Sequence, residues 1–123
     1  MIMGHVYTEL KVIGTKSNHD LERIVIDTGS TYTFMPRELL HEVGALPVPG
    51  DATKLELANK QKVNAEAYAA MLQIGKRKGP CIIVTFDGAS ASVGVQTLEA
   101  LGLKVDPITE KLEETRPVGI AYL

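Results

Sequence analysis

An aspartate stands directly after three consecutive aliphatic residues, 24–26, and is followed by Thr28, Gly29 and Ser30. An aliphatic run of this kind is typical of a buried β-strand, and a carboxylate at its end needs hydrogen-bond donors or water. Gly29 permits unusual backbone dihedrals, and the two hydroxyl groups lie beside the carboxylate. The segment predicts a turn that holds Asp27 rigidly. The alternative interpretation is an ordinary strand end in which Asp27 caps nearby N–H groups.

Other short apolar stretches alternate with polar, glycine- or proline-containing turns, and this pattern favours an all-β fold. Residues 6–14 and 21–27 predict a hairpin that leads into Asp27. A second, longer hairpin is predicted over residues 55–74, with its turn at 59–61. Further strands are predicted at 31–35, 80–86 and 118–123, a loop at 46–50 and a turn at 76–79.

Two short helices complete the predicted fold. One begins at Pro36 and runs to about residue 43, where Gly44 is a natural C-cap. The other follows Gly94, places Leu98 and Leu101 on one face, and ends at Gly102. We see no repeat or linker, so one domain is expected over residues 1–123.

Composition narrows the classes of function. Apolar residues make up 45% of the chain and aromatic residues only 5%, so the core must be mainly aliphatic. The net charge is −2 with both signs scattered, which gives no electrostatic reason to expect nucleic acid or a membrane as a partner. The basic residues 76–78 are interpreted as a solvated turn rather than a binding patch.

The remaining reactive side chains give little indication of a site. Cys81 is the single cysteine, and it is interpreted as a buried strand residue, with a reactive thiol as the alternative. The three histidines are widely separated, so neither a metal nor another cofactor is expected. The N-terminal residues do not resemble a signal peptide, and a cytoplasmic protein is the expectation.

Two segments together resemble a known family. Residues 26–31, Ile-Asp-Thr-Gly-Ser-Thr, resemble the active-site motif of aspartic peptidases. Residues 91–102 are similar to the apolar-apolar-glycine segment and following helix of retropepsin-like peptidases, and the hairpin at 55–74 lies where that family carries its flap. The resemblance implies a retropepsin-like half-barrel, with the order of the motifs matching over most of the chain.

The resemblance also implies roles for individual residues. Asp27 would be the catalytic carboxylate, Thr28 would bond across a two-fold axis, Gly29 would approach substrate, and Ser30 would orient the outer oxygen of Asp27. Gly94 would let the helix segment pack under the active-site loop. The other implied residues contact substrate: Ala58, Asn59 and Lys60 at the flap tip, and Ala89, Ser90 and Ala91 in a side-chain subsite. The tip lacks the glycines of viral flaps.

Aspartic peptidases need two carboxylates that share one proton, and the chain contains one Asp-Thr-Gly segment. A homodimer would supply the second Asp27. The expected function is therefore an aspartic endopeptidase that acts on polypeptide. The alternative is a catalytically silent module of the same fold that binds peptide or only dimerises.

Overall fold

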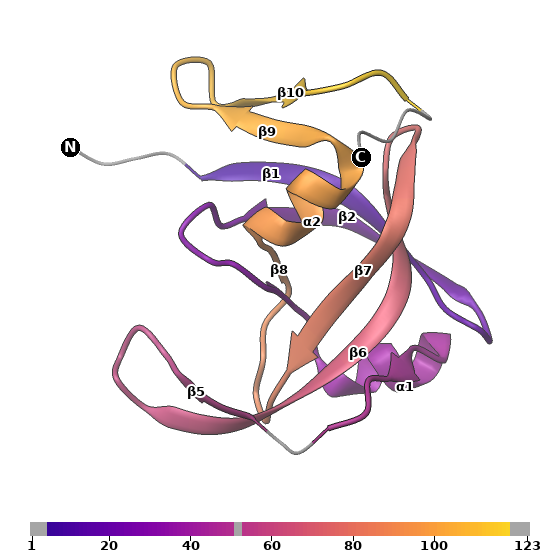
Figure 1. The fold of residues 1–123 in the computed structure, drawn as a ribbon, viewed down its shortest axis with the longest axis vertical. Helices are drawn as coiled ribbons and strands as arrows, with labels where there is room; N and C mark the ends of the chain where they lie inside the picture. Colours follow the sequence, from indigo (N-terminus) through magenta and orange to yellow (C-terminus); the bar gives the residue numbers. More distant parts are fainter. Residues whose placement is uncertain (1–4, 51–52, 119–123) are drawn as a thin grey trace.

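The computed structural model describes residues 5–50 and 53–118, and most of them belong to strands (Figure 1). The all-β prediction is confirmed, with two short helices. In chain order the elements are β1 (Val6–Ile13), β2 (Asn18–Ile26), β3 (Thr33–Phe34), α1 (Arg37–Val43), β4 (Leu46–Pro47), β5 (Thr53–Glu56), β6 (Lys62–Ile74), β7 (Arg77–Thr85), β8 (Ser92–Val93), α2 (Val95–Leu101), β9 (Leu103–Asp106) and β10 (Lys111–Glu114).

The main sheet closes on itself. Its strand order is β1-β2-β8-β3-β7-β6-β4, and β1 pairs with β6 as well as with β2. This extra pairing joins Val12 to Leu72 and makes a ring of six strands. Closure pairs strand edges that would otherwise be exposed, and it encloses one core between the strands.

The core is aliphatic, as the composition predicted. Leu10 and Val12 of β1 face inward at alternate positions, and Ile24 and Ile26 of β2 do the same. The other buried members of this cluster include Met35, Leu39, Leu40, Val43, Leu72, Ile83, Val93, Leu98 and Leu101. Because Ile26 is anchored here, the next residue, Asp27, emerges at the rim of the core.

Both predicted helices are confirmed. Helix α1 ends at Gly44 and α2 ends at Gly102, and these glycines adopt the left-handed conformation with φ values of 73° and 70°. Only glycine adopts this conformation at no steric cost, which is why each helix stops there. Pro36 was predicted to be the first residue of α1, but it occupies the N-cap, so the helix begins one residue later, at Arg37.

Cys81 lies in β7 and belongs to the core, so its interpretation as a buried strand residue is confirmed. Burial raises the pKa of its thiol. The thiol of Cys81 therefore ionises at a lower pH in the unfolded chain than in the folded chain. As the pH rises through the ordinary thiol range, ionisation favours the unfolded chain, and any contribution of this group to stability is lost.

Several predicted elements differ from the structure. Residues 46 and 47 form β4, which pairs with β6, although proline made a loop the simpler interpretation. The hairpin predicted over 55–74 ends near residue 65, because from Glu66 onward β6 pairs with β7. The sequence analysis also missed the hairpin of β9 and β10. The strand predicted at 118–123 lies almost wholly outside the described residues.

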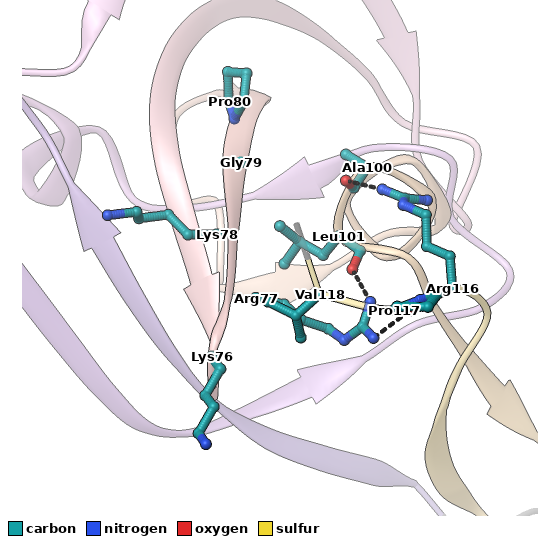
Figure 2. A pocket seen from close by; sticks show the side chains of 10 residues that line it. All are labelled: Lys76, Arg77, Lys78, Gly79, Pro80, Ala100, Leu101, Arg116, Pro117 and Val118. Carbon is teal, nitrogen blue, oxygen red and sulfur yellow. Dashed lines mark hydrogen bonds between the residues drawn. The ribbon is translucent and has the colours of Figure 1, made fainter. Parts of the chain in front are cut away.

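Arg77 is the largest departure from the sequence analysis. It was predicted in a solvated turn, but its side chain is 6% exposed and lies at the C-terminal end of α2 (Figure 2). Its Nη1 donates to the carbonyls of Leu101 and Gly102, at 2.9 and 3.1 Å. Its Nη2 donates to the carbonyl of Arg116 and pairs with Glu114 at 3.2 Å. The last carbonyls of a helix lack partners within the helix, and the guanidinium group satisfies them.

We expect Arg77→Met to lower the free energy of unfolding by about 2–4 kcal/mol, because three carbonyl groups lose a buried donor. Lys76→Met and Lys78→Met are matched controls: both side chains are exposed neighbours, and each change should stay within about 0.5 kcal/mol. Urea unfolding of the three variants measures the difference. Equal losses would show that Arg77 does not stabilise the end of α2.

Candidate active site

Asp27 follows the last residue of β2, where that strand runs parallel to β8. Its backbone N–H donates to the carbonyl of Val93 at 2.8 Å, which ties the start of the turn to β8. Its Oδ1 accepts a hydrogen bond from the N–H of Gly29 at 3.0 Å, and its carbonyl accepts from the N–H of Ser30 at 3.1 Å. Asp27 is nevertheless exposed, so the turn orients the carboxylate and leaves it accessible.

The start of α2 holds the other side of the Asp27 turn. The N–H of Val95 donates to the carbonyl of Ser30 at 2.8 Å, and the N–H of Gln96 donates to the carbonyl of Thr31 at 3.0 Å. Gly94 lies so close to the turn that an added Cβ would be 2.2 Å from the carbonyl oxygen of Tyr32. A side chain cannot fit there without moving the backbone, so the close contact requires glycine.

A buried pair of hydroxyl groups lies beneath this contact. Thr33 and Thr97 are 0% and 1% exposed, and their Oγ1 atoms are 2.7 Å apart. The Thr33 hydroxyl also accepts from the N–H of Gly94 at 3.0 Å. The sequence analysis missed both residues. The sequence could have indicated them, because each element places a hydroxyl group at an inward position, and a buried hydroxyl group needs a hydrogen-bond partner.

The side chains of Thr28 and Ser30 differ in their surroundings. Ser30 donates its hydroxyl to the carbonyl of Tyr32 at 2.9 Å, so within one chain it stabilises the turn rather than orienting the Asp27 carboxylate. Thr28 is exposed beside Asp27. Its bond across a two-fold axis stays a prediction.

The β5–β6 hairpin and the Asp27 turn reach the same side of the molecule (Figure 1). In the hairpin turn, the N–H of Lys60 donates to the carbonyl of Leu57 at 2.8 Å, and Asn59 accepts from the N–H of Gln61 at 2.9 Å. Lys60 has a φ of 66°, a conformation that usually selects glycine in such turns. Ala58 is exposed in the same turn. Among the described residues, no hydrogen bond joins this tip to Asp27.

Among the described residues, two cavities lie near the Asp27 turn. One of ≈340 Å³ is lined by Asp27 and Thr28, and also by Val105, Pro107 and Glu110. The second, of ≈220 Å³, separates the β5–β6 hairpin from the sheet and is mostly apolar. Its lining residues are Tyr32, Leu55, Ala65, Glu66, Ala67, Ile82 and Val84.

The residues predicted for a subsite lie between the end of β7 and β8. Ala89 is buried, Ala91 packs against the core, and Ser90 between them is exposed. None of the three lines the ≈220 Å³ cavity, whose lining was not predicted from the sequence. Tyr32 and Leu55 are 23 residues apart in the sequence, so only the folded chain shows that they share a cavity.

Over residues 5–50 and 53–118, we find no group of three or more His, Cys, Asp or Glu side chains suited to a metal ion. Neither helix in these ranges has the length and apolar character needed to cross a membrane. The chemistry that the site itself presents is that of an oriented, accessible carboxylate.

A family model described as aspartyl protease matches residues 12–105. The chain belongs to this family. The matched segment contains both the Asp27 turn and Gly94 with the start of α2, so the predicted retropepsin-like resemblance is confirmed. No curated protein matches the chain in sequence. Asp27 lies within the matched segment of this aspartyl protease domain.

We expect Gly94→Ala to lower the free energy of unfolding by about 2–4 kcal/mol, because the new Cβ would overlap the backbone of Tyr32. Gly79→Ala is the matched control: its Cβ would meet the Cδ2 of Leu101 at 3.4 Å and the carbonyl oxygen of Ala100 at 3.7 Å, and the change should cost less than about 1 kcal/mol. Chemical denaturation compares the two variants. The interpretation fails if both lose the same stability.

Proposed function

We propose that two copies of this chain pair so that the two Asp27 side chains form one catalytic dyad that hydrolyses peptide bonds. The observation that carries the proposal is the exposed Asp27 carboxylate, held by the N–H of Gly29 at the end of a buried strand. One Asp-Thr-Gly turn per chain supplies one carboxylate, whereas the reaction needs two.

In the proposed dyad, the two carboxylates share one proton, because like charges held close together cannot both ionise easily. The ionised carboxylate removes a proton from a water molecule, which attacks the carbonyl carbon of the peptide bond. The protonated carboxyl group donates to the carbonyl oxygen. The tetrahedral intermediate then collapses, the proton passes to the departing nitrogen, and an acid and an amine are released.

The proposed substrate is an extended polypeptide that lies between the β5–β6 hairpin and the Asp27 turn. An extended chain can pair its backbone with neighbouring strands, while alternate side chains enter pockets. The ≈220 Å³ cavity beside Tyr32 and Leu55 suits an aliphatic side chain, because its other walls include Ile82 and Val84. Closure of the hairpin would exclude bulk water from the site, while the attacking water molecule stays between the dyad and the substrate.

Asp27→Asn should abolish cleavage of a denatured protein substrate, with a loss on the order of 10³ or more, and leave the fold intact. Glu110→Gln is the matched control, since this carboxylate lines the same cavity as Asp27 and should be dispensable. Assays would cover acidic to neutral pH, with and without a transition-state mimic such as pepstatin. Full activity in Asp27→Asn would rule out the assignment, and an inactive wild-type chain would favour the silent module.

The proposed dimer makes activity depend on the concentration of the chain. Activity per chain should fall on dilution in parallel with dissociation of a dimer, because a separated chain carries half of the dyad. Sedimentation velocity and cleavage assays over the same concentration range measure both quantities. Mixing wild-type chains with an excess of Asp27→Asn chains should suppress activity through mixed dimers. A monomer that cleaves peptide at high dilution would contradict the proposal.

A further inference from the structure

Strand β6 changes its partner at one residue. Up to Ala65 it pairs with β5, and together they form the hairpin that projects beside the site. From Glu66 onward it pairs with β7, beginning opposite Thr85. Glu66 is therefore the root of the hairpin, the point where a projecting two-stranded element joins the closed sheet. A motion of the hairpin relative to the sheet must bend the chain near this residue.

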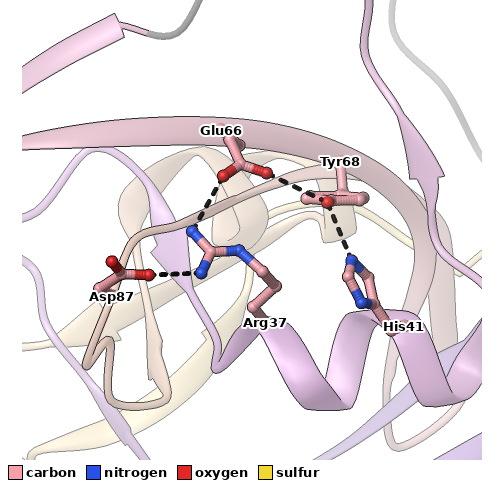
Figure 3. A network of polar contacts seen from close by, with 5 residues as sticks. All are labelled: Arg37, His41, Glu66, Tyr68 and Asp87. Atoms are coloured by element: carbon pink, nitrogen blue, oxygen red, sulfur yellow. Dashed lines mark hydrogen bonds and ion pairs between the residues drawn. The ribbon is translucent and has the colours of Figure 1, made fainter.

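Arg37 holds this root (Figure 3). It is the first residue of α1, and its Nη2 donates to Glu66 at 2.9 Å. Its Nη1 donates to Asp87 at 2.5 Å, so one planar guanidinium group binds two carboxylates at once. The hydrogen bond that Arg37 donates to Asp87 raises the pKa of the Arg37 guanidinium group.

Asp87 belongs to the turn that follows β7. The N–H of Ala89 donates to the carbonyl of Phe86 at 3.0 Å across this turn, and the chain then continues through residues 89–91 to β8. Phe86 also packs edge-on against Phe34, with 5.7 Å between ring centroids. Arg37 thus joins the hairpin root to the turn that leads into the predicted subsite segment.

The contacts extend from Glu66 along β6 to α1. The Tyr68 hydroxyl donates to Glu66 at 3.3 Å and lies 3.2 Å from the Nε2 of His41 (Figure 3). Burial, followed by the charge of Glu66, raises the pKa of Tyr68, so its hydroxyl stays protonated and able to donate. Both oxygens of Glu66 therefore have fixed partners, one on α1 and one on β6.

Stability is a poor explanation for this cluster. Asp87 is 93% exposed and Glu66 is 45% exposed, and ion pairs this open to water contribute little to folding. The Nε of Arg37 is buried without a hydrogen-bond partner among the described residues, which opposes folding. Because Arg37 binds Glu66 and Asp87 at once, it fixes the geometry of α1, β6 and the turn after β7 relative to one another.

We propose that Arg37 is a positioning residue that fixes the root of the β5–β6 hairpin against the Asp87 turn and thereby sets how tightly substrate is held. The consequence for substrate rests on the proposed peptidase function. The mechanical part, coupling of the hairpin to the turn, does not depend on cleavage. Arg37 acts through Glu66 and Asp87 and does not touch the reacting bond.

Arg37→Gln should raise KM for a peptide substrate by about five- to tenfold and change kcat little, because the substitution weakens binding of the substrate and of the transition state equally. In the same variant without substrate, amide hydrogen exchange should become faster at Leu57 and Lys60, whose N–H groups are bonded in the hairpin turn. Arg37→Lys should bring KM and hydrogen exchange only part of the way back to the wild-type values, since one ammonium group cannot bind Glu66 and Asp87 in the fixed planar geometry of a guanidinium group.

Glu66→Gln and Asp87→Asn each remove the charge from one of the two contacts of Arg37, and both should move KM and exchange in the direction of Arg37→Gln. Lys104→Met is the control, because it breaks an exposed ion pair with Glu113 in the β9–β10 hairpin. The proposal is overturned if Arg37→Gln matches Lys104→Met in KM and in exchange at 57–61. Should wild-type protein prove inactive, exchange alone decides the coupling, and the proposed function fails separately.

Discussion

The backbone of Gly94 lies against the carbonyl of Tyr32, and the geometry of the Asp27 turn depends on this contact. This contact allows the N–H groups at the start of α2 to reach the carbonyls of the turn. In the core below, the hydroxyl groups of Thr33 and Thr97 are hydrogen-bonded to each other. From the other side, Val93 accepts the N–H of Asp27. Hydrogen bonds from two elements therefore fix a short turn, and a preorganised carboxylate requires that rigidity.

Rigidity on one side of the site contrasts with the β5–β6 hairpin on the other. The turn of this hairpin is exposed, whereas its root is held by Arg37 through two carboxylates. The proposed peptidase needs a fixed carboxylate and a covering element that admits an extended chain and then excludes bulk water. The proposed dimer would duplicate this arrangement about the two Asp27 residues.

Two arginines show where sequence patterns give no guidance. Arg77 looks like the middle of a basic turn, yet it is buried at the end of α2 because the turn is two residues shorter than predicted and the strand begins at this residue. Arg37 looks like an ordinary residue of a first helical turn, yet it bridges β6 and the turn after β7. Both act on groups that are distant in the sequence, and local composition carries no information about such partners.

The sequence by itself determined the all-β class, the first hairpin, both helices with their terminal glycines, and Asp27 at the end of a buried strand. These features follow from local periodicity and from the conformational freedom of glycine, which neighbouring residues reveal. Only the tertiary structure decided where β6 leaves β5 for β7, which residues line the cavity beside Tyr32, and what Arg37 and Arg77 bind. Strand pairing and buried polar contacts join residues far apart in the chain, so they are fixed when the sheet closes.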